Sequence, residues 1–526
     1  MEETRLYEKR WWALGVLILS LLVISLDNTV MNVALPSIVR ELRASASQLQ
    51  WIVDAYVLVF AGLLLTGGSI GDRLGRKGAL TAGLVIFGTG SALGAFAGSA
   101  GQLIATRALM GVGGALMMPA TLSITTNIFP ANERPKAIAI WAAISGLGFG
   151  IGPVVGGWLL ERFWWGSVLL VNIPVVVVSL ALGRFLVPTS KDSSAPRADV
   201  PGTLLSIAGL TSLLYGIIEA PRNGWSDSST LMWLGIAVVL LSVFVAWELH
   251  TDHPMLDVRF FENPRFTAAS LAITLAFFAL AGTMFFLTQY LQFLKGYSAL
   301  SAGVRILPAA LAAAAGAGPG AALNKRYGAK VTVFIGLTMT AGALWLMSTV
   351  TVASGYGLAA AAMVLGGLGL GMATMPATDS IMGSLPKAKA GVGSAVNDTT
   401  REIGGALGVA ILGSIMASGF GSQMAATVKT LPAQVAAVAK DSLGGALTVA
   451  GQMGGGAGRA IAEAARGAFV NGAGTALLIG AVIAFAGSLV ALLFLPAREK
   501  AEGVQQVITI DIEPTEVGGL ETERVA

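Results

Sequence analysis

The chain has 526 residues, of which 55% are hydrophobic and 12% are charged, whereas soluble domains carry about 25% charged residues. Its net charge of +4 gives no indication of a nucleic-acid partner, and the lack of cysteine excludes disulfides, thiolate metal sites and iron–sulfur clusters. The two histidines, His250 and His253, do not suffice for a metal site. Composition therefore predicts an all-α polytopic membrane protein with no metal and with lipid as its surroundings.

Apolar stretches of about 20 residues, the length that crosses a bilayer, occur fourteen times along the chain. The first is too long for the core of a signal peptide, so we predict an uncleaved helix that starts in the cytoplasm. The predicted spans are 11–35, 48–71, 78–98, 101–128, 136–160, 166–188, 201–220, 230–250, 266–294, 301–324, 331–352, 356–384, 391–420 and 469–496.

Two related loops indicate an internal repeat. Residues 68–77 and 320–330 share a glycine, a polar residue four positions later, a basic cluster and a second glycine. Their spacing predicts two six-helix halves with two inserted helices between them, 14 transmembrane helices in all. The predicted units are an N-terminal half at 1–190, the inserted helices at 191–260, a C-terminal half at 261–497 with a long outer loop at about 421–468, and a cytoplasmic tail at 498–526.

Basic clusters alternate with neutral turns in a way that places both termini in the cytoplasm. Two short turns predicted to lie outside, 99–100 and 353–355, carry no charge. The long outer loop is predicted to be either a helical hairpin over an exit or a passive spacer. The clusters predicted to be cytoplasmic are Arg73/Arg76/Lys77, Arg134/Lys136, Lys325/Arg326/Lys330 and Lys387/Lys389.

Asp27 lies about 16 residues into the first predicted span, so at 1.5 Å per residue its carboxyl group is roughly 24 Å from Trp11. A charge at such a depth costs at least about 2.5–3.5 kcal/mol, and ionisable residues there usually face a pathway or a partner. We therefore predict that Asp27 is a protonatable acid on a substrate route. The alternative is a carboxyl group neutralised in a helix contact.

Two further ionisable residues lie at a similar predicted depth. Arg107, in the fourth span, needs an acid or a carbonyl partner because its guanidinium stays protonated. Asp54 lies in the second span. If Asp27, Asp54 and Arg107 meet at one level, water or a bound cation decides whether the acid holds its proton. We predict that the three form a proton or cation coupling site.

The thirteenth span carries Asp398, Arg401 and Glu402 at i, i+3 and i+4 spacing, which places them on one helix face. Either they neutralise one another near the cytoplasmic end, or they form a second proton or cation site. Asp398 and Glu402 are therefore included among the predicted coupling residues.

Two segments are predicted to act in a conformational switch. The turn with Asp72 can pair its carboxylate with a guanidinium in one conformation only, the alternative being an ordinary positively charged turn. In the fifth span Pro153 favours a kink, and glycines at four-residue spacing give a smooth face, the alternative being packing alone. The predicted gate residues are Asp72, Arg73, Gly75, Arg76, Lys77, Gly148, Gly152, Pro153, Gly156 and Gly157.

Aromatic, methionine and amide side chains in the spans are candidates for a promiscuous cavity, although most such side chains face lipid or neighbouring helices. The group at 285–290 ranks first, because the repeat places the ninth span beside the cavity. The predicted lining residues are Asn32, Tyr56, Met110, Phe285, Phe286, Gln289 and Tyr290, with Trp51, Met117 and Met375 as further candidates.

These segments resemble the major facilitator superfamily, and within it the fourteen-span drug:proton antiporters. Residues 26–36 are similar to the first-span motif of that branch, and residues 68–77 to the loop signature of the superfamily. Residues 103–114 resemble the fourth-span motif, and residues 146–157 the signature associated with antiporters. The resemblance extends over almost the whole chain.

Two positions depart from the family pattern. Glu402 follows Arg401 where the branch often has glutamine, which adds a titratable group. Asn324 replaces the acid of the second loop, which implies that gating differs between the two halves.

The resemblance implies the major facilitator fold and alternating access, in which protons enter as a lipophilic, often cationic, drug leaves. Asp27 would take up the proton or cation, and Asp54 and Arg107 would adjust how readily Asp27 does so. It also implies a monomer in a bacterial inner membrane, with drugs and protons as its partners and the proton gradient, not a cofactor, as its energy source.

Other functions remain open. An exporter of a single endogenous metabolite or antibiotic is the main alternative, and import by proton symport is less favoured by the glycine–proline signature. A non-transporting membrane enzyme would need a catalytic set that neither histidine supplies. An ATP-driven pump is disfavoured because the Gly-x-x-x-x-Gly-Lys-Ser/Thr run does not occur.

Overall fold

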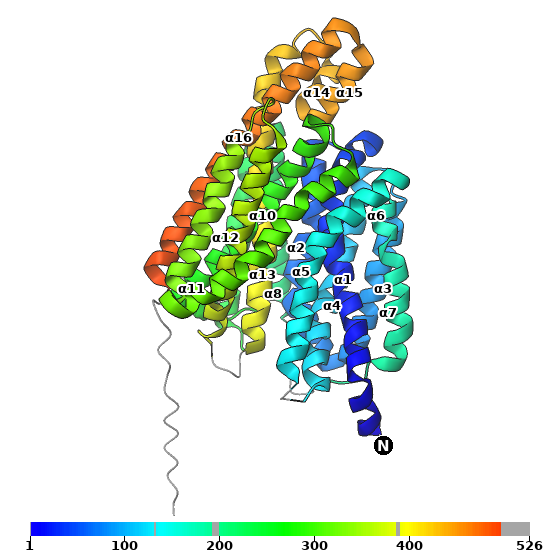
Figure 1. Cartoon of the computed structure of the whole chain (residues 1–526), viewed down its shortest axis with the longest axis vertical. Helices are drawn as coiled ribbons and strands as arrows, with labels where there is room; N and C mark the ends of the chain where they lie inside the picture. Colours follow the sequence, from blue (N-terminus) through cyan, green and yellow to red (C-terminus); the bar gives the residue numbers. More distant parts are fainter. Residues whose placement is uncertain (1, 131–132, 192–198, 386–389, 496–526) are drawn as a thin grey trace, which may run out of the picture.

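The computed structural model describes residues 2–130, 133–191, 199–385 and 390–495, and every regular element in these ranges is a helix. The helices run along one long axis, with the first residues at one end of the bundle (Figure 1). At the other end lie two short helices, which are labelled α14 and α15. We call these two ends the N-terminal end and the hairpin end.

The first half of the bundle follows the predicted spans closely, except at the sixth. That span is broken at Val171 into a single turn and a longer helix. The helices of this half are α1 (Glu2–Leu42), α2 (Ala46–Leu74), α3 (Arg76–Ala95), α4 (Ala100–Ile128), α5 (Arg134–Arg162), α6 (Ser167–Leu170) and α7 (Asn172–Leu186).

The inserted helices are α8 (Val200–Asn223) and α9 (Ser228–His250), which pack on each other as an antiparallel pair. Asp199 caps α8 and Asp227 caps α9, because each carboxylate accepts a main-chain N–H of the first turn. α8 also packs against α2 and α13, one from each half of the bundle. The inserted pair therefore lies across the junction between the halves.

The second half begins after a short 3-10 turn, η1 (Val258–Glu262), and contains one helix that was predicted as two. The predicted spans 301–324 and 331–352 form a single element, α11, which turns sharply at Gly328 (φ 82°, ψ 172°). The helices of this half are α10 (Pro264–Gln289) with the π-turn η2 (Tyr290–Leu294), α11 (Ala299–Ser348), α12 (Tyr356–Met382), α13 (Ala390–Thr427) and α16 (Gly455–Phe494).

The predicted outer loop at about 421–468 is mostly helical. α13 continues to Thr427 and α16 starts at Gly455, and between them lie α14 (Ala433–Asp441) and α15 (Leu443–Met453). In Figure 1 these helices stand above the rest of the bundle. The structure therefore has the helical hairpin that was one of the two predictions for this segment.

The predicted repeat has a counterpart in the packing. A side chain at Gly68 would lie 3.3 Å from Cβ of Pro119, so α2 and α4 approach closely there. A side chain at Gly320 would lie 2.8 Å from Cα of Met372, so α11 and α12 approach in the same way. Close helix contacts of this kind depend on glycine.

The most extensive contacts between the halves, among the described residues, join α5 to α11 and α2 to α13, and α1 also contacts α10, α11 and α15. Near the hairpin end Gln292 donates to the carbonyl of Val33 (2.9 Å), and Gln50 donates to the carbonyl of Val409 (3.3 Å). The halves are thus held together by polar contacts toward the hairpin end.

Within the described residues, 12 helical segments are long and apolar enough to cross a membrane by length and composition. The chain is therefore a multi-pass membrane protein. The predicted tail at 498–526 and the basic residues Lys387 and Lys389 lie outside the described residues.

Candidate functional site

A buried ion pair joins α1 to α4. Arg107 Nη1 donates to Asp27 Oδ2, and each residue is only 1% exposed. Arg107 Nε also donates to the carbonyl of Ile52 in α2 (3.1 Å), and its guanidinium lies 4.4 Å from the ring centre of Tyr56. The arginine thus fixes three helices around one carboxylate.

The second carboxylate oxygen is held by a polar chain from α7 and α3. Asn172 Nδ2 donates to Asp27 Oδ1 (3.2 Å) and to Ser91 Oγ (3.0 Å), and Ser91 donates to the carbonyl of Leu169 (2.8 Å). Sequence reasoning missed Ser91 and Asn172. A signal was present, because Asn172 is a polar residue at the start of an otherwise apolar segment.

Asp54 does not join this pair. Gln50, one turn earlier on α2, reaches α13 by donating to the carbonyl of Val409, so the face of α2 that carries Gln50 and Asp54 is directed at the other half. Asp54 is fully buried, and within the described residues neither of its oxygens has a hydrogen-bond partner. An ionised carboxylate there would have no donor to compensate its burial.

The second predicted acidic group lies on α13. Arg401 Nη1 is 3.9 Å from Asp398 Oδ1, and Arg401 Nη2 donates to Thr378 Oγ1 in α12 (3.3 Å). Glu402 interacts electrostatically with both neighbours and, across the junction of the halves, with Tyr56. The two acidic groups therefore lie on different halves of the bundle, Asp27 on α1 and Asp398 and Glu402 on α13.

The turn at the N-terminal end is held by contacts within the first half. Arg76 Nε donates to Asp72 Oδ1 (2.6 Å), and Gly75 makes the turn with φ 133°, a value that favours glycine. The N–H of Arg76 donates to the carbonyl of Ser190, and Lys77 Nζ to that of Arg184 (2.8 Å), while Arg73 is exposed. The turn is thereby docked on the segment that ends α7.

The α5 signature lies between two helices. Gly148, Gly152 and Gly156 face α1, where side chains at these positions would meet Ser25, Thr29 and Val30. Thr29 also donates to the carbonyl of Gly148 (3.1 Å).

The opposite face of α5 meets α11. A side chain at Gly303 would meet the carbonyl of Pro153, and one at Gly157 would lie 2.5 Å from Cα of Leu300 and 2.6 Å from the carbonyl oxygen of Ala299. Both contacts are with main chain, so the halves approach as closely as backbone allows here.

Alanine at Gly157 is expected to push the halves apart at the hairpin end, because the main chain of α11 cannot yield; overpacking of this kind costs about 1–3 kcal/mol. Since the chain has no cysteine, Val33→Cys with Gln292→Cys gives an unambiguous crosslink between the halves at the nearby contact of α1 with η2. The crosslinking yield should fall several-fold when Gly157→Ala is added.

Gly150→Ala on the same helix is the matched control, since its methyl group would make an ordinary 3.5 Å contact with Ala310. A yield that stays equal in Gly157→Ala and Gly150→Ala would show that the close approach at Gly157 does not hold the halves together.

A small cavity lies beneath α14 and α15 at the hairpin end. Two of the predicted lining residues, Phe285 and Gln289, face it. Phe286 and Tyr290 instead stack on each other (5.6 Å), and Phe286 stacks on Phe469 of α16 (5.4 Å). The lining residues are Ala46, Gln50, Phe285, Gln289, Gly413, Met416, Ala417, Phe420, Asp441, Ser442, Leu443 and Phe469.

The other predicted lining residues lie elsewhere in this conformation. Tyr56 and Met110 are buried within the first half, where Tyr56 stacks on Phe60 (5.7 Å). Asn32 lies in α1 with its Oδ1 buried and without a partner among the described residues. Of the further candidates, Met117 is buried, Trp51 lies beside Tyr215 of α8, and Met375 is exposed on α12.

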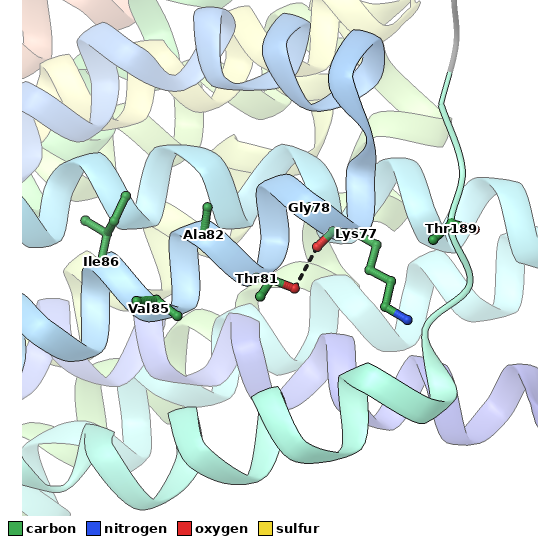
Figure 2. Close-up of a pocket in the computed structure, with 7 residues that line it drawn as sticks. All are labelled: Lys77, Gly78, Thr81, Ala82, Val85, Ile86 and Thr189. Carbon is green, nitrogen blue, oxygen red and sulfur yellow. Dashed lines mark hydrogen bonds between the residues drawn. The ribbon is translucent and has the colours of Figure 1, made fainter.

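An open groove on the first half lies away from the Asp27 pair and the α13 group and reaches the charged turn only at Lys77. Figure 2 shows its lining residues, with Val85 and Ile86 of α3 toward one end and Lys77 of α3 and Thr189, from the segment after α7, toward the other. Its walls are almost entirely apolar and Val85 is exposed. In a multi-pass membrane protein such a surface faces lipid, so the groove is not part of the candidate site.

Asp441 fastens the hairpin to the bundle. Its Oδ2 accepts the N–H of Ala46 at the start of α2 (2.8 Å). Burial raises the pKa of this carboxyl, as does Glu219 of α8, while the Ala46 N–H and Arg222 act to lower it, and the net direction is upward. The closed hairpin therefore binds a proton at Asp441 more tightly than an open one would, so closure should weaken as the pH rises through the raised pKa.

Alanine at Asp441 is expected to loosen the hairpin, because α2 loses an acceptor at its N-terminus, a contact worth about 1 kcal/mol. Trypsin added from the hairpin side should then cut after Lys429 and Lys440 about fivefold faster. Asp441→Asn keeps an acceptor, so trypsin should cut it as slowly as the unmodified protein. Its cutting rate should no longer depend on the pH through residue 441. Equal cutting rates in all three proteins would contradict this role.

Comparison with known proteins places these features in a family. The sequence profile of the Major Facilitator Superfamily matches residues 17–409. The chain is 38% identical to the multidrug efflux pump LfrA of Mycolicibacterium smegmatis, over 93% of this chain and 96% of the relative. It is 32% identical to the tetracenomycin C resistance and export protein of Streptomyces glaucescens, over 92% and 91%. It is also 32% identical to the methyl viologen resistance protein SmvA of Salmonella typhimurium, over 90% and 97%.

Solved structures agree on the fold. A bacterial homologue of the human lysosomal transporter Spinster, in an inward-facing and unoccupied conformation, superposes with a TM-score of 0.64 at 19% identity, over 93% of this chain and 98% of the other. A POT family transporter superposes with a TM-score of 0.59 at 15% identity, over 92% and 96%. At such identities the likeness concerns the fold alone.

Proposed function

Because the chain belongs to the Major Facilitator Superfamily, and its relatives include a multidrug efflux pump and a methyl viologen resistance protein, we propose that it is a proton-coupled antiporter. It exports lipophilic, often cationic, drugs by alternating access. The observation that carries the proposal is the buried Asp27–Arg107 pair, an ionisable couple at the meeting point of four helices.

The pair supplies a proton switch. In this structure both oxygens of Asp27 accept hydrogen bonds, from Arg107 and from Asn172, which suits the ionised carboxylate. A proton that reaches Asp27 neutralises it and removes the charge that holds the guanidinium, so the contact between α1 and α4 weakens. One proton entering for each monovalent cation leaving would be electroneutral and would use only the pH gradient; two protons would also use the voltage.

The substrate path is proposed to run between the halves. Buried polar atoms without partners among the described residues line that junction: Asn32 Oδ1, both oxygens of Asp54, and the hydroxyl of Tyr290. A drug or water in the path would satisfy them. Glu402 and Asp398 are the second acidic group that such a cation would pass.

The conformation supports an inward-facing assignment. The polar contacts between the halves lie toward the hairpin end, where Gly157 and Gly303 also bring α5 and α11 together. With the N-terminal end in the cytoplasm, as its basic turns indicate, release to the outside is closed in this structure. The proposed location is a bacterial inner membrane with both termini cytoplasmic.

We assign fourteen crossings to the chain. α11 has 50 residues and would be about 75 Å long if straight, more than twice the thickness of the hydrocarbon core. Its turn at Gly328 divides it into two crossings. α5, with 29 residues of apolar sequence, provides another. The second crossing of α11 and the crossing by α5, added to the 12 apolar helical segments, make fourteen, the number expected for the fourteen-span branch.

The test is efflux of ethidium, a lipophilic cation, from cells that produce the protein. Efflux should stop when an uncoupler collapses the proton gradient. Efflux that continues under the uncoupler while ATP is intact would contradict proton coupling, and the absence of any efflux would contradict a broad drug exporter.

A narrower exporter is the second candidate, favoured by the relative named for tetracenomycin C resistance and export. It predicts that a single compound is transported and that unrelated cations do not compete. Inhibition of ethidium efflux by several unrelated lipophilic cations would exclude it.

A further inference from the structure

A second pair of acidic side chains is buried far from Asp27, at the N-terminal end of the inserted helices. Glu248 lies in the last turn of α9 and is 3% exposed. Its Oε2 accepts the N–H of Leu256 (3.0 Å), from the segment that follows α9. Its Oε1 has no hydrogen-bond partner in the described part of the chain. This single oxygen is therefore buried and left unsatisfied.

The opposite carboxylate is fully supplied with donors. Asp199, 8% exposed, accepts the N–H of Gly202 at Oδ1 (2.9 Å) as the cap of α8. The indole N–H of Trp247 lies 2.9 Å from Oδ1 and 3.1 Å from Oδ2. These contacts suit an ionised carboxylate at the start of a helix. Asp199 is thus the natural acceptor of this pair.

The unsatisfied oxygen faces that acceptor. A Cβ atom on Gly202 would lie 2.5 Å from both Asp199 Oδ2 and Glu248 Oε1, so the two oxygens are at most twice 2.5 Å, or 5.0 Å, apart. The two side chains interact with each other directly. Two carboxylates at such a distance in a buried site do not both ionise, and one holds a proton.

We propose that Glu248 and Asp199 hold one proton between them, carried on Glu248 Oε1 and donated toward Asp199 Oδ2. This makes the pair a proton-binding site separate from Asp27. The proton satisfies the one oxygen that the protein leaves without a donor.

The surroundings offer no competing cation among the described residues. From α2, the neighbour is the uncharged hydroxyl of Thr66, which contacts Thr203. From the segment after α9, the sulfur of Met255 lies 3.5 Å from Thr203 Oγ1. The basic groups nearby bind main chain instead: His250 Nδ1 lies 2.7 Å from the carbonyl of Ala246 and Arg259 donates to that of Leu249 (2.9 Å).

The position of the site gives the proton a structural effect. Asp199 ends the connection from the first half, and Leu256 belongs to the connection that leads to the second half. The shared proton therefore holds both connections together, and Thr203 and Thr66 tie them to α2. Loss of the proton leaves two facing carboxylates, which repel each other and loosen this junction.

The first test is infrared difference spectroscopy of the full chain in lipid at neutral pH. Glu248→Gln should remove one carbonyl band of a protonated carboxyl group, and this band should be present in Asp27→Asn. Glu219→Gln, at the other end of the inserted pair, is the matched control and should keep the band. Loss of a carboxylate band in place of the carbonyl band in Glu248→Gln would overturn the proposal.

The second test is thermal stability as a function of pH. The unmodified protein should lose stability as the pH rises and the shared proton leaves. Glu248→Gln should lose less stability over the same pH range, because its amide N–H permanently replaces the donor, while the contribution of Asp441 remains in both proteins. If Glu248→Gln fails to fold, Asp199→Asn serves instead: its amide donates to Glu248, so a carboxylate band should replace the carbonyl band. An unchanged carbonyl band in Asp199→Asn would also overturn the proposal.

Discussion

Asparagine in place of Asp27 is expected to abolish uphill transport of ethidium. The substitution keeps the size of the side chain and an acceptor for Asn172, but it removes the group that takes up a proton. In one-for-one exchange each unit of pH gradient supplies about 1.4 kcal/mol, which is about a tenfold concentration ratio. The unmodified protein should reach that ratio in proteoliposomes with an imposed pH gradient, and Asp27→Asn should reach none.

Asp252→Asn is the control for this experiment, because Asp252 is exposed in the segment after α9. It should keep the full ratio. If Asp27→Asn accumulates as much ethidium as the control, Asp27 is not the coupling acid, and Asp54 or Glu402 would have that role.

Alanine in place of Arg107 is expected to destabilise the fold severely. It leaves the buried carboxylate of Asp27 without its cation and opens a cavity beside Tyr56. Breaking a buried ion pair by removal of one partner costs about 3–5 kcal/mol. Thermal unfolding of the purified protein measures the loss, and the exposed Arg162→Ala should leave the unfolding temperature unchanged.

The double substitution Asp27→Asn with Arg107→Met separates charge from packing. It removes both buried charges and fills most of the arginine volume, so stability should return toward that of the unmodified protein while transport stays abolished. A double variant no more stable than Arg107→Ala would show that packing around the guanidinium, not the ion pair, determines stability here.

The pairing of Asp27 with Arg107 was within reach of the sequence, because both are ionisable, both lie deep in apolar spans, and a guanidinium requires a partner there. The same reasoning did not predict that Asp54 lies apart from the Asp27–Arg107 pair. The sequence predicted how far along α2 Asp54 lies, but the direction of its side chain depends on the rotation of the helix, which brings Gln50 into contact with α13. Spacing within one helix does not contain that information.

The supporting polar chain was missed for a related reason. Asn172 contacts Asp27 only because α6 and α7 break at Val171 and place its amide toward α1. Similarly, the acidic pair of Asp199 and Glu248 joins residues 49 positions apart, at the start of α8 and the end of α9. Such contacts depend on how helices pair and not on any local pattern.

The turns at Gly75 and Gly328, in contrast, were predictable from the local sequence. The predicted repeat placed a second glycine in each loop, and the structure has a positive φ at both, 133° at Gly75 and 82° at Gly328. Local chemistry decided this, since such angles favour glycine. The outer segment at 421–468 was left open between hairpin and spacer because an alanine-rich sequence suits either, and its docking through Asp441 is a tertiary contact.

The most direct measurement is the number of protons released when the purified protein binds ethidium in a lightly buffered solution. Drug and proton exchange at Asp27 predicts that drug binding releases protons, with an upper limit of one proton per bound drug, and that Asp27→Asn releases none. Drug binding without proton release, or equal release from Asp27→Asn, would contradict the account.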